Sequence, residues 1–238
     1  MTKKPTATGE QQFQLPPLNL KDMRVSIIGD TPLLVHAWSE KAKRQMLEAQ
    51  TKKATRGRET RDPDADYRSS IYRLPDGSHG IPSVGLKNAA VTACTSIASV
   101  TKVAARQAFF ILGQRSTSNG AHQGALTSDS LVPLLGLAPP NMHEALVRVG
   151  MGNADLRWRA EYFPWACEFI VRFNERALSA EQVINLIDTA GFAVGINEWR
   201  PEKSGDLGRF HVARDDDKAF LKQAKPIFDA KERGRARG

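Results

Sequence analysis

Two neighbouring stretches of the chain, separated by Pro164, alternate strictly between apolar and other side chains. In residues 155–163 the apolar side chains on one face are Leu156, Trp158, Ala160 and Tyr162. In residues 165–173 they are Trp165, Cys167, Phe169, Val171 and Phe173. Period two is the spacing of side chains along a β-strand. We therefore expect two consecutive strands, joined as a hairpin at Pro164.

Two helices stand out from the rest of the pattern. Ser179 and Gln182 have the spacing of a capping box, an apolar helical face follows, and Gly191 is the expected end of that helix. A second helix is expected to begin near Ser83, where Ser is a good N-cap and apolar residues recur at helical spacing. Both helices should pack against the predicted strands.

Shorter strands complete the order. We expect them at residues 24–28 and 107–112, with two further strands or strand ends at 193–199 and 207–213 and a short helix at 215–223. Without the insertions, placed at about 39–78 and 114–147, the order is βαββαβ. This is an α+β, ferredoxin-like sheet with two helices on one face. The domain spans residues 23–213, between a disordered arm (1–22) and a basic tail (214–238).

Length and composition exclude several classes of protein. The 238 residues include 41% hydrophobic and 25% charged residues, which are globular averages. No apolar run has the length of a membrane span, and the first twenty residues lack the apolar stretch of a signal peptide, so we expect a cytoplasmic protein. Cys94 and Cys167 cannot form a disulfide framework or a zinc ribbon, and both are expected to be buried, inert thiols.

The charge is basic, with 34 Lys and Arg against 26 Asp and Glu, a net charge of +8. A positive net charge favours a polyanionic partner. Between Lys41 and Asp62 there are eight basic and three acidic residues, and residues 222–238 hold six and two. The alternative interpretation of such runs is a solvated helix face and a solubilising tail.

No motif in the sequence indicates a metal, a cofactor or a standard hydrolase. The five histidines stand apart from one another, and neither a nucleophile elbow nor a phosphate-binding glycine loop is present. A single histidine is nevertheless enough to act as a general base in RNA cleavage, where the 2′-hydroxyl is the nucleophile. His36 and His79 are the candidates for that role.

The segment from Gly195 to Phe210 is the richest in binding chemistry. Its glycines at 195, 205 and 208 permit close backbone approach or a positive φ. The segment also supplies an aromatic ring and three cations: Trp199, Arg200, Lys203 and Arg209. A stacking plane beside cations is the composition of a site for single-stranded nucleic acid. The alternative is a glycine-rich hairpin with Trp199 packed on the sheet.

Three segments resemble the RAMP superfamily of CRISPR proteins, which includes the subunit that forms the backbone around guide RNA. Residues 25–33 (VSIIGDTPL) resemble its first strand, residues 81–87 (IPSVGLK) its helix entry, and residues 195–210 its glycine-rich loop. Gly85 and Asn88 depart from the helix-entry pattern, and residues 198–201 interrupt the glycine loop. The sequence of that loop, EWRPEK followed by GRF, also resembles a group of uncharacterised tailed-phage and prophage proteins.

The resemblance implies that Lys87 and the turn at residues 205–209 lie near the backbone of a bound strand, and that the two insertions contact a neighbouring subunit or the nucleic acid. We therefore expect a non-catalytic, phage-encoded protein that binds single-stranded RNA or DNA and self-associates along it. The residues expected to bind are Lys41, Lys43, Arg44, Lys87, Arg157, Arg159, Trp199, Arg200, Lys203 and Arg209. The alternatives are a metal-independent endoribonuclease on the same fold and a phage assembly or inhibitory protein that acts through protein contacts.

Overall fold

The computed structural model describes residues 17–37, 47, 51, 62–96, 100–114, 126–127, 130–149 and 153–229. It is a mixed α+β structure with one large sheet and one small one, and every strand pairing in the described part of the chain is antiparallel. The large sheet has the order β11-β1-β10-β5-β7-β4-β3, with β6 on β5 and β12 on β7. The small sheet has the order β2-β9-β8.

The strands of the large sheet are β1 (Leu20–Gly29), β3 (Tyr72–Arg73), β4 (His79–Pro82), β5 (Phe109–Gln114), β6 (Leu126–Thr127), β7 (Leu131–Gly136), β10 (Trp165–Asn174), β11 (Phe210–Val212) and β12 (Lys225–Pro226). Those of the small sheet are β2 (Leu33–Val35), β8 (Asn141–Val149) and β9 (Asn153–Tyr162). The helices are α2 (Pro63–Ser69), α3 (Ser83–Ala93), α4 (Lys102–Ala108), α5 (Ala180–Ala193) and α6 (Lys218–Gln223), with 3-10 turns η1 (Cys94–Ser96), η2 (Pro201–Lys203) and η3 (Asp215–Asp217).

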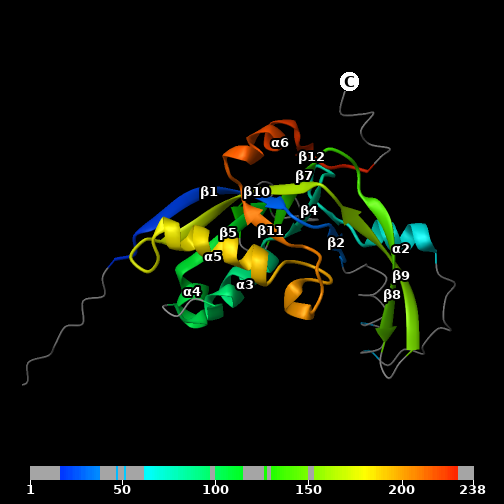
Figure 1. Cartoon of the computed structure of the whole chain (residues 1–238), viewed down its shortest axis with the longest axis horizontal. Helices are drawn as coiled ribbons and strands as arrows, with labels where there is room; N and C mark the ends of the chain where they lie inside the picture. The colour runs from blue at the N-terminus through cyan, green and yellow to red at the C-terminus, as the bar shows by residue number, and fades with distance from the viewer. Residues whose placement is uncertain are drawn as a thin grey trace, which may run out of the picture.

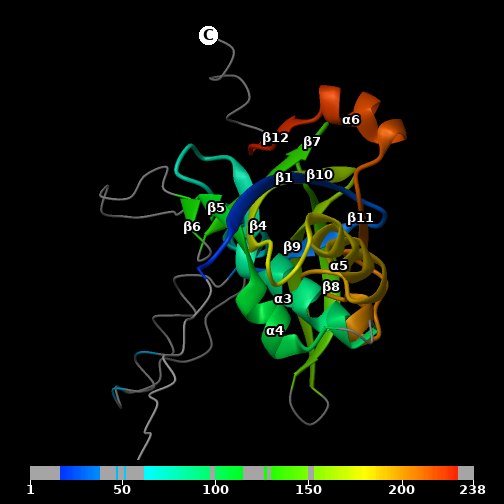
Figure 2. The same ribbon diagram turned by 90° about the vertical axis from the view of Figure 1, so that its left-hand side faces the viewer.

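The core lies between the large sheet and the pair α3 and α5, which run together beneath it in Figure 1. Alternate residues of β10, among them Phe169 and Val171, face these helices. Leu86 of α3 and Leu186 of α5 are buried in the same core. Cys94 and Cys167 are buried there, as expected, and burial raises the pKa of both thiols. Figure 2 shows the same layers end-on, with α6 on the opposite side of the sheet.

The predicted hairpin at Pro164 is wrong. The two alternating strands are present as β9 and β10, but β9 pairs with β8 and β2, whereas β10 pairs with β1, β5 and β7. Period two identifies a strand without identifying its partner. The chain therefore passes from the small sheet to the large one at this point.

The capping box of α5 is confirmed, because Ser179 Oγ accepts from the amide of Gln182 and the Gln182 side chain accepts from the amide of Ser179. Gly191 does not end the helix, however, which continues to Ala193 and is followed by Gly195 at φ +68°. A Cβ at Gly191 would overlap the carbonyl oxygen of Phe210. The glycine at 191 therefore permits close packing of α5 on β11.

Four other segments differ from the expectation. Residues 20–22, expected in the disordered arm, belong to β1. Residue 193 is the end of α5, and residues 194–199 form turns and bends rather than a strand. The predicted insertion at 114–147 contains β7, which joins the large sheet through buried Val132 and Leu134 in spite of Pro133. The described part of the predicted tail, to residue 229, includes η3, α6 and β12, and Ile227 is buried against β7. In the described ranges, no helix has the length and apolar character needed to cross a membrane.

Candidate functional site

The segment that we call the Trp199 loop, residues 195–208, leads from α5 back toward β11. Its two ends are held together because the amide of Ile196 donates to the carbonyl of Gly208 at 3.0 Å and the amide of Leu207 donates to that of Trp199 at 2.9 Å. The amide of Gly208 also donates to the carbonyl of Pro32, just before β2. The loop is thus closed on itself and attached to the start of the small sheet.

Trp199 lies in an uncommon backbone conformation. Three non-glycine residues of the loop have positive φ: Asn197 (61°), Trp199 (54°) and Ser204 (61°). A bulky residue rarely adopts this region, and residues that do so gather at functional sites. A Cβ at Gly205 would overlap the carbonyl oxygen of Trp199. The glycine at 205 therefore allows the loop to hold Trp199 in this position.

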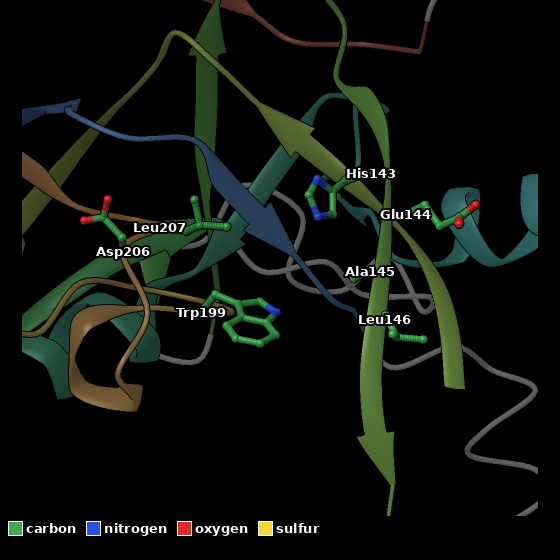
Figure 3. Close-up of a pocket in the computed structure, with 7 residues that line it drawn as sticks. All are labelled: His143, Glu144, Ala145, Leu146, Trp199, Asp206 and Leu207. Atoms are coloured by element: carbon green, nitrogen blue, oxygen red, sulfur yellow. The ribbon is translucent and has the colours of Figure 1, made fainter. Parts of the chain in front are cut away.

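The indole of Trp199 borders a pocket of about 280 Å³ between the loop and β8. Trp199 is 48% exposed, although it is the largest kind of apolar side chain. Figure 3 shows the indole directed toward β8, with His143 on its side of the strand and the side chains of Glu144 and Leu146 directed away. Ala145, Asp206 and Leu207 complete the lining. An exposed aromatic plane beside an open pocket can stack on a flat ligand.

The face of the β8–β9 ribbon that carries His143 also carries two arginines. Arg159 lies opposite His143 and Arg157 lies opposite Ala145 in the register of these strands. Each basic group on this face has a carboxylate: His143 Nδ1 is 2.8 Å from Glu161, and Arg157 Nε is 3.3 Å from Asp155. Arg157 keeps about a third of its side chain exposed. It can therefore reach an anion in solution as well as Asp155.

Glu198 lies between Arg159 and His36. Its Oε2 accepts from Arg159 Nη1 at 3.2 Å, and its Oε1 is 3.3 Å from His36 Nδ1. The hydrogen bond with His36 holds the pKa of Glu198 below its usual value, with help from the charge of Arg159 and against the effect of burial. Arg159 is only 3% exposed, and this burial lowers its pKa. A phosphate cannot approach Arg159 without displacing the groups that cover it.

Both arginines predicted to bind nucleic acid in this segment have a carboxylate partner. Arg200 forms an ion pair with Glu202 at 2.6 Å and donates to the carbonyl of Asn197, and Arg209 Nε is 3.1 Å from Asp206. Both arginines keep about a third of their side chains exposed. Lys203 is exposed at the end of η2. Trp199, Arg200 and Lys203 thus lie in the Trp199 loop and Arg209 directly follows it, and both arginines have a carboxylate partner.

Lys87 belongs to another part of the surface. Its ammonium lies 3.6 Å from the centre of the Phe110 ring on β5, a cation–π contact. Burial lowers its pKa, and Arg106 of α4 adds to that effect. Neither Phe110 nor Arg106 lines the pocket beside Trp199. Lys41, Lys43 and Arg44 lie outside the described residues.

The two candidate histidines, His36 and His79, differ in their exposure to solvent. The imidazole of His79 is wholly buried, with Tyr162 Oη 3.0 Å from Nδ1 and Asp229 3.2 Å from Nε2. Burial lowers its pKa to about 4. His79 is therefore a wrong candidate for a base acting on a polymer, because the substrate cannot reach it. His36 is part-exposed beside Glu198 and remains accessible.

Sequence reasoning missed His143 and Glu198 as members of this site. Their contacts join distant parts of the chain: Glu198 is 162 residues from His36. The position of Glu198 directly before the predicted stacking residue Trp199 was the one feature of the sequence that could have indicated its role. Among the described residues, no group of three or more acidic, histidine or cysteine side chains is arranged to hold a metal ion.

No protein-family model matches this chain, and no curated protein is significantly similar to it. The functional interpretation therefore depends on the geometry described above and on the resemblance of the three short segments.

Proposed function

We propose that this protein binds single-stranded nucleic acid, RNA or DNA, by stacking a base on Trp199, and that it does so without catalysing a reaction. The observation that carries the proposal is the exposed indole, held at positive φ by a closed loop and facing an open pocket. Base stacking on an aromatic side chain contributes about 1–3 kcal/mol per base and tolerates any sequence.

Charge supports the same partner, although less strongly than the net charge alone suggests. The chain carries a net charge of +8. Lys203 is exposed, and Arg157, Arg200 and Arg209 each keep about a third of their side chains exposed. Arg157 is the cross-strand neighbour of Ala145 in the pocket lining, and the other three belong to the segment that follows Trp199. Each of the three arginines has a nearby carboxylate. A phosphate has to compete with that carboxylate for each arginine. We therefore expect a modest number of phosphate contacts, with stacking as the main contribution.

We also propose that β1, α3, β5, β10, α5 and β11 form a ferredoxin-like unit of the RAMP type. The strand order β11-β1-β10-β5 and the placement of α3 and α5 beneath the sheet support this interpretation. Numbered 1 to 4 along the chain, these strands are β1, β5, β10 and β11. Their order across the sheet is therefore 4-1-3-2. Self-association along the strand and a phage origin follow from the resemblance alone.

The proposal is tested by titrating a labelled oligonucleotide with the purified protein and following fluorescence anisotropy at about 50 mM salt. We expect saturable binding that weakens as salt is added, since phosphate contacts release counterions. The absorbance ratio at 260 and 280 nm, followed by RNase and DNase treatment, shows which polymer the protein carries after purification. Absence of binding at low salt to both RNA and DNA contradicts the proposal and favours a protein partner.

A second candidate, a metal-independent endoribonuclease, is favoured by one observation. His36 Nδ1 is oriented by the Glu198 carboxylate at 3.3 Å, which is the arrangement of a histidine base and its orienting acid. Cleavage of RNA but not of its 2′-deoxy analogue supports this candidate, and cleavage that persists in His36→Ala removes His36 from it.

A further inference from the structure

We propose that Arg159 and His36 position Trp199 through Glu198, rather than contacting the ligand themselves. We refer to these three residues as the Glu198 clamp. The inference rests on the proposed function, because it concerns how the stacking surface is held. It reassigns Arg159, which the sequence pattern places among the residues that bind nucleic acid.

The clamp joins three separate elements. Glu198 belongs to the Trp199 loop, Arg159 to β9, and His36 follows β2. The amide of Glu198 also donates to the carbonyl of Leu34 in β2 at 3.3 Å. The residue before Trp199 is therefore attached to the small sheet by both its backbone and its side chain. The two carboxylate oxygens have different partners, so the side chain is fixed in direction as well as in position.

The burial of Arg159 makes the contact with Glu198 necessary. A buried guanidinium without a counter-charge is strongly unfavourable, and Glu198 is the acid that Arg159 contacts among the described residues. Arg159 Nε is itself buried without a hydrogen-bond partner in that part of the chain. Movement of Glu198 away from Arg159 would therefore leave the whole guanidinium uncompensated. This favours the one loop conformation in which Glu198 stays in place.

Trp199 follows Glu198 directly, so the clamp fixes the position of the backbone that carries the indole. At φ 54°, the backbone of Trp199 is in a region that a bulky residue does not adopt without support. On its other side, the carbonyl of Trp199 accepts from Leu207. The clamp and this hydrogen bond together hold the indole against the pocket beside His143, which is the cross-strand neighbour of Arg159. A surface that is ordered before binding loses less conformational entropy when a base stacks on it.

The neighbouring Arg157–Asp155 pair shows the contrast. It lies on the same face of β9, but Arg157 is about a third exposed and its carboxylate partner is two residues away on its own strand. This ion pair therefore lies within a single strand. Burial and the distance in sequence between the partners therefore separate a positioning arginine from a surface one.

The inference is tested with protein labelled with 5-fluorotryptophan, whose ¹⁹F spectrum reports each tryptophan separately. The Trp199 signal is assigned from its loss in Trp199→Phe. We expect Glu198→Gln to shift or broaden this signal without nucleic acid, while the signal of buried Trp165 stays in place. His36→Gln removes only the part-exposed partner, so it should give a smaller change in the same signal in a protein that folds normally.

The matched control is Glu168→Gln, which removes an exposed carboxylate paired with Arg24 on the large sheet, at 2.6 Å. It should leave the Trp199 signal unchanged. In anisotropy titrations, Glu198→Gln should weaken binding of a single-stranded oligonucleotide about tenfold, within the range of one lost stacking contact. Glu168→Gln should bind like the original protein.

The outcomes separate the clamp from the function. A Trp199 signal that is the same in Glu198→Gln, His36→Gln and the original protein overturns the inference. A signal that moves while affinity is unchanged also overturns it, because the positioned indole would then not be used in binding. A signal that moves in a protein that binds no oligonucleotide supports the clamp and overturns the proposed function.

Discussion

The outer face of the large sheet and the Trp199 site carry similar charges but differ in what they leave open. On the outer face, away from α3 and α5, Arg24 pairs with Glu168 and Arg172 makes two hydrogen bonds to Asp22. Phe110 on β5 is the cross-strand neighbour of Arg172 and so lies on this face. Its exposed ring is contacted by the ammonium of Lys87, which reaches it from α3. At the Trp199 site the arginines are paired as well, but the indole faces an open pocket. Under the proposed function, an accessible aromatic plane, rather than the number of cations, therefore distinguishes the candidate interface from the rest of the surface.

The largest effect is expected from removing the indole. Trp199→Ala should weaken oligonucleotide binding by about 1–3 kcal/mol, or roughly 5- to 150-fold, because it removes a stacking surface. Phe110→Ala, on the outer face, should change the affinity by less than about twofold on the same reasoning. Anisotropy titrations of both variants give the comparison. A greater loss in Phe110→Ala would move the binding site to the outer face.

The next effect comes from the shape of the Trp199 loop. Gly205→Ala would place a Cβ against the carbonyl of Trp199, and the loop must shift to avoid that overlap. We expect binding to fall about tenfold, comparable with one lost stacking contact, while the helical circular dichroism signal is kept. Gly85→Ala is the control, since a Cβ there meets nothing within 4 Å. Equal affinities for the two variants would show that the loop conformation does not matter for binding.

A smaller effect is expected from the charge of Arg157. If Arg157 contacts one phosphate, Arg157→Gln should make the slope of log affinity against log salt less negative by about 0.7. Arg24→Gln, on the outer face, should leave the slope unchanged. Titrations over a series of salt concentrations measure both slopes. A change in the Arg24→Gln slope alone would reverse the distinction between the two regions.

The smallest effect concerns the stability of β11, the strand that follows the Trp199 loop. Both ring nitrogens of His211 face carboxylates, Asp30 at 2.6 Å and Asp217 at 3.0 Å. Burial would lower the pKa of His211, but the hydrogen bonds to Asp217 and Asp30 outweigh it, and the pKa is raised.

A raised pKa in the folded state means that protonated His211 stabilises the protein below the unfolded pKa of about 6.5, and that this contribution is lost as the pH rises through the folded value. His211→Gln should therefore lower Tm at pH 6 by about 2 °C and by less at pH 8. Thermal unfolding at the two pH values measures this. The same decrease at both pH values would show that the charge on His211 contributes nothing.

Local sequence signals predicted much of the fold but not its pairings. The capping box at Ser179 and the alternation in β10 are read within one element, so both were found. The partner of β9 was missed because alternation is the same whichever strand lies beside it. Pro133 concealed β7, since proline inside an apolar run usually argues against a strand.

The candidate site was predicted in part. Trp199 and its glycines stand together in the sequence, so their composition indicated a binding loop. The ion pairs could not be predicted from local sequence patterns, because their partners are far apart in the chain. Arg172 and Asp22 are separated by 150 residues, and Arg159 and Glu198 by 39. A cation binds a phosphate more readily when folding leaves it without a carboxylate partner, and that depends on tertiary contacts.

Photo-crosslinking tests the central claim most directly. A single-stranded oligonucleotide containing 5-iodouracil is irradiated with the full-length protein, and the crosslinked peptide is identified by mass spectrometry. The proposal predicts attachment at Trp199, with loss of that product in Trp199→Ala and its retention in Phe110→Ala. Crosslinks confined to the outer face of the large sheet, at Phe110 or β1, would contradict it.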